Sequence, residues 1–199
     1  VGIAPVGRFE GLAPEAHPLS IQPGARSVVV LAFSIPRGSL QGIECGMAWH
    51  TLAVGTPSSV AVDSTYLICR VLESEGLEAT PLFRQPGDGR KQGVRVNPDK
   101  PEPNVILEFD YAAHAAGLGH VGRGKWFLTP EFGPRQIFTI ILTDAELEPD
   151  APFSGSVCDG CGACAEACPA HAMKADGEKR MALCEGEAVW YPLHLESCR

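Results

Sequence analysis

The chain has 199 residues, of which 45% are hydrophobic and 20% are charged, and its formal net charge is -8. These values are ordinary for a globular protein that buries a core, and the length suggests one main domain with a small appendage. The acidic balance argues against a broad electrostatic grip on phosphate groups, so we expect no nucleic acid partner.

No apolar run reaches the length of a membrane span, and no signal peptide or twin-arginine leader is visible. The chain holds eight cysteines, six of them near its C-terminal end, which fits a reducing compartment. We therefore expect a cytoplasmic protein without a membrane partner. Because the chain begins without methionine and stops one residue after Cys198, it is a candidate fragment of a longer protein.

The first half of the chain predicts two strands and one long helix. Residues 27–33 follow a Pro-Gly turn and form an apolar run, which indicates a buried strand. Between residues 58 and 75 apolar side chains recur at helical spacing, and Gly76 stands where a helix C-cap is expected. Residues 78–83 predict a short strand, whereas the glycine- and proline-rich residues 85–103 predict a loop.

The second half predicts one helix, one strand and a linker. The helix is expected over residues 104–116, the strand over residues 136–143, and the acidic, proline-bearing linker over residues 144–152. Helices and strands alternate loosely, which predicts an α+β fold, or α/β layers, around one sheet. The linker separates a domain over residues 1–150 from a cysteine-rich tail over residues 151–199.

The tail carries the pattern C-x2-C-x2-C-x3-C-P, the spacing by which bacterial-type ferredoxins hold iron–sulfur clusters. Its members are Cys158, Cys161, Cys164, Cys168 and Pro169. The three closely spaced thiolates point at one cluster, whereas the fourth is turned towards a different cluster. A zinc ribbon or a disulfide knot fits less well, because zinc sites usually pair two separated C-x2-C knuckles. The spacing therefore predicts a protein that handles electrons.

Two further cysteines, Cys184 and Cys198, lie downstream on the tail, and we favour both as metal ligands. If they form a second cluster with Cys168, one ligand of that cluster is missing from the chain. If a single cluster forms, the first three cysteines need one remote partner, for which Cys198 is a candidate. We therefore expect one or two [4Fe-4S] clusters.

The hexapeptide Gly-Leu-Gly-His-Val-Gly matches G-x-G-x-x-G through Gly117, Gly119 and Gly122. A dinucleotide site needs this motif after a strand, and here it follows a predicted alanine-rich helix, so we do not favour such a site. The glycines let the backbone approach a flat or anionic ligand closely, and Arg123 and Lys125 are placed to meet phosphate or carboxylate groups. The alternative is a glycine-rich helix terminus with ordinary surface cations.

Three residues near these glycines are further candidates for a site. His120 lies within the motif itself, and Asp110 and Tyr111 lie on the predicted helix that leads into it. A buried tyrosine usually packs with its hydroxyl satisfied, yet a tyrosine beside a redox cofactor can donate a proton to a carbanion-like product. We therefore carry Asp110 and Tyr111 as candidate catalytic residues.

An ordered series of motifs resembles one known superfamily. The series comprises residues 23–30, 115–123, 128–135 and 142–144, followed by the cysteine pattern. It is similar to the core of the superfamily that contains the corrinoid-dependent reductive dehalogenases and the epoxyqueuosine reductases. The forms at Arg123 and at Pro130-Glu131 look closer to the dehalogenase branch.

This resemblance implies a domain like the flavin nitroreductases that holds a corrinoid (cobalamin), followed by a ferredoxin-like tail. It also implies two [4Fe-4S] clusters that relay electrons to cobalt. Carried over by position, Cys158, Cys161 and Cys164 would hold one cluster. Cys168, Cys184 and Cys198 would belong to the other. The glycine loop, residues 117–123, would line the corrinoid through Gly117, Gly119, His120, Gly122 and Arg123.

Our leading hypothesis is an iron–sulfur oxidoreductase that passes electrons from a donor such as ferredoxin or flavodoxin, through [4Fe-4S] clusters, to a corrinoid that reduces a small-molecule substrate. The alternative is an electron-transfer or corrinoid-reducing partner protein without a substrate of its own. A flavin (FMN) in place of cobalamin is a third, less favoured possibility.

Overall fold

The computed structural model describes residues 1–39, 50–83, 97–99, 105–173 and 176–198. At its centre is a four-stranded sheet in the order β1-β2-β6-β3, in which every neighbouring pair is antiparallel. The strands are β1 (Gly2–Pro5), β2 (Ser27–Ser34), β3 (Ala79–Phe83) and β6 (Gln136–Thr143). The longest pairing joins β2 to β6 along their full lengths, from Ser27 opposite Thr143 to Ser34 opposite Gln136.

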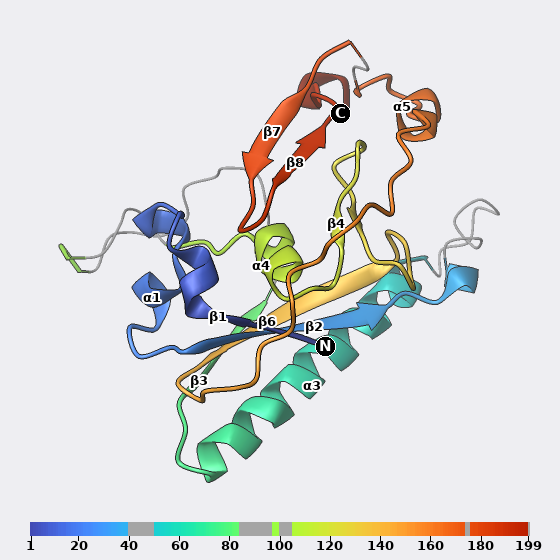
Figure 1. Cartoon of the computed structure of the whole chain (residues 1–199). Helices are drawn as coiled ribbons and strands as arrows, with labels where there is room; N and C mark the ends of the chain where they lie inside the picture. Colours follow the sequence, from blue (N-terminus) through green and yellow to red (C-terminus); the bar gives the residue numbers. More distant parts are fainter. Residues whose placement is uncertain (40–49, 84–96, 100–104, 174–175, 199) are drawn as a thin grey trace.

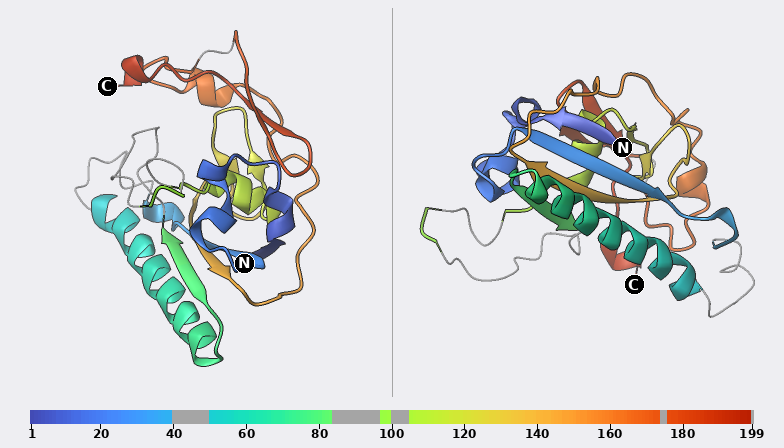
Figure 2. Two further views of the ribbon diagram at one scale, coloured as in Figure 1. Left: turned by 90° about the vertical axis from the view of Figure 1, so that its left-hand side faces the viewer. Right: turned by 90° about the horizontal axis from the view of Figure 1, so that it is seen from below.

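Two helices cover the two faces of this sheet. The long helix α3 (His50–Ser74) crosses one face, and the short helix α4 (Phe109–Ala115) lies on the other (Figures 1 and 2). Because side chains alternate along a strand, Val28 in β2 packs into the α4 cluster, whereas its neighbour Val29 packs beside Cys69 of α3. The continuous apolar run of β2 is therefore explained by burial on both faces.

Shorter elements complete the chain. They are η1 (Val6–Phe9), η2 (Pro14–Ala16), α1 (Pro18–Ile21), β4 (His120–Val121), β5 (Phe127–Leu128), α5 (Ala163–Glu166), β7 (Lys179–Ala182), β8 (Glu187–Trp190) and η3 (Leu195–Cys198). The strands β4 and β5 form one hairpin, and β7 and β8 form another.

The β7–β8 hairpin lies with its closed end on helix α4 (Figure 1). The Nε2 atom of His114 is 3.2 Å from the carbonyl oxygen of Glu185 at that end, and Ala188 is buried in the same apolar cluster as α4. At the other end of β8, the amide of Tyr191 donates to the carbonyl of Arg123 across 2.8 Å. The tail therefore shares core contacts with the sheet domain. The proposed boundary at residue 150 stays a prediction.

The predictions for β2, β3 and β6 are confirmed, and Gly76 ends α3 in the left-handed conformation, with φ of +81°. The predicted helix start at residue 104 is wrong, because α4 begins only at Phe109. The amide of Ile106 instead donates to the carbonyl of Glu15, 2.8 Å away, which holds this segment outside the helix. The predicted loop over residues 85–103 falls mostly outside the described residues.

The coarse fold class, helices mixed with small antiparallel sheets and followed by a cysteine-rich tail, is confirmed. The finer likeness to nitroreductases stays a prediction. Among the described helices, none combines the length and apolar character that crossing a bilayer requires.

Candidate functional site

The cysteine run, residues 158–168, is a tight loop that ends in the short helix α5. Gly160 and Gly162 have φ of +75° and +79°, a left-handed conformation that side chains with a Cβ rarely adopt. The amide of Cys161 donates to the Asp159 carboxylate across 3.0 Å, which stabilises the first turn and holds the pKa of that carboxyl below its usual value. These turns place three thiols on one short, accessible segment.

The fourth cysteine of the run, Cys168, is surrounded by backbone donors. The amide of Ala172 lies 3.3 Å from its sulfur. Hydrogen bonding from this amide, and from others up to residue 173, lowers the pKa of the Cys168 thiol. Since metal ions bind the thiolate form, this environment is suited to a metal ligand.

The glycine loop packs directly against the cysteine run. A Cβ atom on Gly122 would lie 3.3 Å from the Cβ of Cys158, and the amide of Arg123 donates to the Cys158 sulfur across 3.5 Å. The close approach predicted from the glycines is thus made, at these positions, to the candidate metal ligands. Gly117 and Gly119 instead face protein backbone, the carbonyls of Ala151 and Leu128, so the fold itself requires them to be glycine.

His120 joins the glycine loop to the start of the cysteine run. Its Nδ1 accepts from the amide of Val157 across 3.4 Å, and its Nε2 is 3.3 Å from the Ser156 hydroxyl. That hydroxyl donates to the carbonyl of Cys158 across 2.6 Å. Because Nδ1 accepts, a neutral imidazole with its proton on Nε2 satisfies all three of these hydrogen bonds. Burial, followed by the charge of nearby His114, lowers the pKa of His120, which also favours the neutral imidazole.

A cleft of about 270 Å³ lies between these segments. The glycine loop and the cysteine run form most of its wall, and strand β8 adds two residues. The lining residues are His120, Val121, Gly122, Arg123, Ser156, Cys158, Asp159, Gly160, Glu187 and Val189. Of the predicted cofactor-binding residues, His120, Gly122 and Arg123 meet here beside one predicted metal ligand, Cys158.

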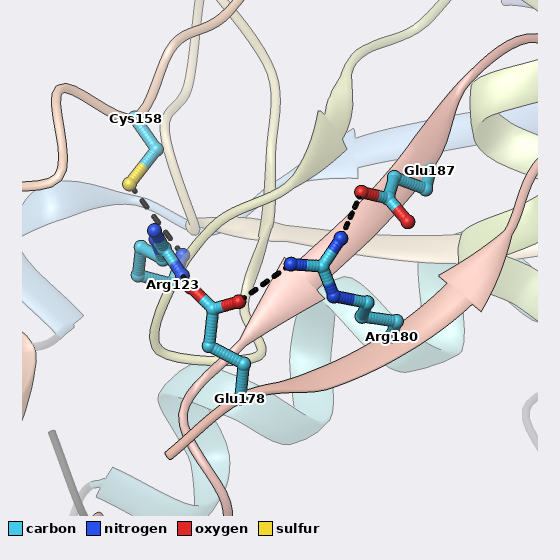
Figure 3. Close-up of polar contacts among 5 residues, drawn as sticks. All are labelled: Arg123, Cys158, Glu178, Arg180 and Glu187. Atoms are coloured by element: carbon cyan, nitrogen blue, oxygen red, sulfur yellow. Dashed lines mark hydrogen bonds and ion pairs between the residues drawn. The ribbon is translucent and has the colours of Figure 1, made fainter. Parts of the chain in front are cut away.

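A chain of alternating charges borders this cleft (Figure 3). Glu178 binds Arg123 through one carboxylate oxygen at 2.6 Å and Arg180 through the other at 2.7 Å. Arg180 also binds Glu187, 2.5 Å away on the paired strand. Hydrogen bonds from the two arginines lower the pKa of Glu178, and the bond to Glu178 raises the pKa of Arg123.

The two candidate catalytic residues do not line the cleft. The Asp110 carboxylate is 3.9 Å from the ammonium of Lys125. Tyr111 is buried beside Phe9, and its hydroxyl donates to the carbonyl of Arg8 across 2.8 Å. Burial, followed by the charge of Cys184, raises the pKa of Tyr111. Their catalytic roles stay predictions.

Of the remaining cysteines, Cys184 lies apart from the run. Cys184 is at the closed end of the β7–β8 hairpin, packed against the α4 cluster, and burial raises the pKa of its thiol. Cys198 belongs to η3, at the end of the described chain, and Cys45 falls outside the described residues. Among the described histidine, cysteine and acidic side chains, no group of three converges in a metal-binding arrangement. The second ligand set stays a prediction.

Sequence reasoning missed the polar partners of the site, Ser156, Glu178, Arg180 and Glu187. Ordinary serine, arginine and glutamate residues in a charged tail carry no spacing signal. The contacts of Glu178, Arg180 and Glu187 arise because β7 pairs with β8 and the hairpin then meets a loop 55 positions earlier in the chain. Ser156 contacts His120 and Cys158 because the glycine loop packs against the start of the cysteine run. The sequence shows the order of the charged residues on the hairpin but not which of them pair with one another.

Comparison with known protein families supports the binding of a 4Fe-4S cluster by the segment around the cysteine run. Residues 152–174 match the family model of the 4Fe-4S binding domain. A tetrachloroethene reductive dehalogenase of Desulfitobacterium hafniense is 41% identical over 69 residues, which cover 33% of this chain and 12% of that protein. An epoxyqueuosine reductase of Bacillus cereus is 26% identical over 172 residues, 81% of this chain and 40% of that protein. The chain thus spans less than half the length of these relatives.

Solved structures with the same fold come from reductive dehalogenases. One, described as suggesting a mechanism for B12-dependent dehalogenation, has a TM-score of 0.70 at 18% identity and covers 99% of this chain and 26% of that chain. Another, a catabolic reductive dehalogenase, has a TM-score of 0.65 at 19% identity and covers 87% of this chain and 22% of that chain. At such identities the likeness concerns the fold alone.

Proposed function

Because the chain is related to the superfamily that contains the reductive dehalogenases and the epoxyqueuosine reductases, we propose that it is an iron–sulfur oxidoreductase of this kind. In this proposal it receives electrons from a donor protein such as ferredoxin or flavodoxin. It passes them through [4Fe-4S] clusters to a corrinoid beside the glycine loop, for the reduction of a small-molecule substrate. The observation that carries the proposal is the contact between the glycine loop and Cys158, which joins the two predicted sites at one cleft.

The residues of the cysteine run fit an iron–sulfur cluster by their chemistry. Thiols are the ligands that such clusters require, and Cys158, Cys161 and Cys164 occupy one short loop shaped by left-handed glycines. The amides that surround Cys168 lower the pKa of its thiol and so favour the thiolate form. Cys168 would serve a second cluster, for which Cys184 and Cys198 remain the proposed further ligands.

The fit to a corrinoid is partial. The cleft of about 270 Å³ is close to the lower end of small-molecule sites, which span roughly 300–1,000 Å³, so it accommodates an edge of the macrocycle and no more. A corrinoid supplies a cobalt centre that accepts electrons and reduces the substrate. The chain's own part would be to hold that edge between His120 and Arg123, within reach of the cysteine run.

Two features of the cleft would serve electron transfer. The backbone around Gly122 packs against the Cβ of Cys158 and so covers one side of that residue. Burial lowers the pKa of the His120 imidazole, and the neutral ring adds no charge to the wall of the cleft. Both features would lower the reorganisation energy of electron transfer to the cluster.

The proposal is tested by measuring iron, sulfide, cobalt and flavin per chain after anaerobic reconstitution with cobalamin. About eight irons with about one cobalt are expected for two clusters and a corrinoid, and about four irons for a single cluster. Cys161→Ser should lose at least one cluster. Cys69→Ser, which changes a cysteine buried between α3 and the sheet, should keep the iron content. A chain without iron would refute the proposal. Bound flavin without cobalt would mean that the cofactor is FMN and not a corrinoid.

A second candidate function is an electron-transfer or corrinoid-reducing protein without its own substrate. It is favoured by one observation, that neither Asp110 nor Tyr111 lines the cleft to act as an acid. Clusters that cycle and reduce a partner protein, together with no cobalt binding and no turnover of halogenated or epoxide compounds, would establish this second function.

A further inference from the structure

Arg123 is held at the cleft through its main chain, independently of its side chain. Its amide donates to the Cys158 sulfur across 3.5 Å, and its carbonyl accepts from the amide of Tyr191 across 2.8 Å. The guanidinium makes a separate contact and binds Glu178. A change to the side chain therefore alters the charge beside Cys158 while the backbone contact to the sulfur is retained.

The charges that continue from Arg123 alternate in sign. Glu178 is shared by Arg123 and Arg180, and Arg180 is shared by Glu178 and Glu187 (Figure 3). Two cations thus face two carboxylates, so the group is neutral as a whole. Removing any one member leaves a net charge at the edge of the cleft.

This group is poorly suited to stabilise the fold. The side chains of Arg123, Glu178 and Arg180 are 36%, 40% and 57% exposed, and ion pairs at such exposure contribute little to stability. Arg123 nevertheless lines the same cleft as Cys158, and its amide reaches the Cys158 sulfur across 3.5 Å. The charges act on the cysteine more than on the fold.

We propose that Arg123 and Glu178 set the electron affinity of the cluster bound by Cys158, Arg123 as the cation that stabilises the reduced state and Glu178 as the carboxylate that limits its effect. The inference rests on the proposed function, because it requires Cys158 to be a cluster ligand. An added electron makes the cluster more negative, so a nearby cation favours reduction and a nearby anion opposes it. Glu178 acts through Arg123 and is a positioning residue, which tunes the potential without touching the substrate.

The test is a redox titration, followed by electron paramagnetic resonance, of the anaerobically reconstituted chain. Glu178→Gln should raise the reduction potential, Arg123→Gln should lower it, and the double variant should return towards the wild-type value. Each single change is expected to alter the reduced-to-oxidised ratio at fixed potential roughly two- to fivefold, the range that an exposed ion pair supports. At about 1 M salt, where the screening length falls to about 3 Å, both shifts should shrink.

Glu146→Gln is the matched control, because it removes one carboxylate from an ion pair with Arg26 in the sheet domain. It should leave the potential unchanged, and where two clusters form the shifts should be confined to one of them. A wild-type chain that binds no iron would overturn both this inference and the proposed function. If the clusters are intact and the reduction potential is unchanged in all three variants, this inference alone is overturned. The same holds if the potential shifts with the same sign in both single variants.

Discussion

Gly124 lies directly against Cys164: a Cβ atom on this glycine would be 3.0 Å from the cysteine sulfur and 2.9 Å from the Trp126 ring. The hairpin that carries the glycine loop and the loop that carries the thiols therefore leave no room for a side chain between them. The glycine at this position serves the contact between two segments that are 40 residues apart in the chain.

Gly124→Ala should consequently lower cluster assembly. The added methyl group has to displace Cys164 or Trp126, and overpacking of this kind typically costs about 1–3 kcal/mol. Iron per chain and the visible absorption of the reconstituted protein measure the effect. Gly24→Ala is the control, since no atom lies within 4 Å of the added carbon at that position. Equal iron content in both variants would contradict the tight contact.

Stability should fall on acidification through protonation of His120. Burial lowers the pKa of this histidine in the folded protein below the ordinary histidine pKa of 6.5, so the unfolded chain binds the extra proton more readily. The stabilisation is complete above the unfolded pKa and is lost as the pH falls through the folded pKa, where Nδ1 can no longer accept from Val157. Denaturant unfolding at several pH values measures this dependence.

In that experiment His120→Gln should flatten the dependence of stability on pH. The exposed His194 provides the comparison, and His194→Gln should retain the wild-type slope. A wild-type slope in the His120 variant as well would mean that other groups account for the acid sensitivity.

Cys184 offers a test of the ligand assignment. It sits at the closed end of the β7–β8 hairpin against the α4 cluster, whereas Cys168 contacts the segment that pairs with the open end, near Leu193. The four-residue strands between them extend about 13 Å. As a proposed ligand of the same cluster, Cys184 should behave like Cys168, so we expect Cys184→Ala and Cys168→Ala both to lose iron. A Cys184→Ala variant that keeps its iron and loses only stability would show instead that Cys184 serves to pack the hairpin against the α4 cluster.

Lys125 should hold the β7–β8 hairpin to the rest of the protein. Its ammonium is 4.5 Å from the ring centroid of Trp190 and 3.9 Å from the Asp110 carboxylate. Lys125→Met should reduce the free energy of unfolding by about 0.5–1 kcal/mol, the usual size of an exposed cation–π contact. Lys125→Arg keeps the cation and should lose less, whereas an equal loss in both variants would show that the positive charge alone does not hold the hairpin.

Much of the fold follows from patterns that are local in the sequence. The strand β6 was predicted with its observed bounds, because eight consecutive residues of high strand preference contain no breaker. The start of α4 was missed for the opposite reason. A hydrogen bond between Ile106 and Glu15, 91 positions apart, holds four residues out of a helix that their own pattern favours.

By itself the sequence determined the chemistry of the protein: four cysteines at ferredoxin spacing, and glycines where the backbone must turn or approach closely. Spacing along the chain is sufficient for these features, because one short loop holds all of the participating atoms. Only the tertiary structure decided that Cys158 meets Arg123, and that Glu178 and Glu187 complete the charges around the cleft. These residues come from three separate segments, and sheet pairing and shared burial, which no local pattern records, bring them together.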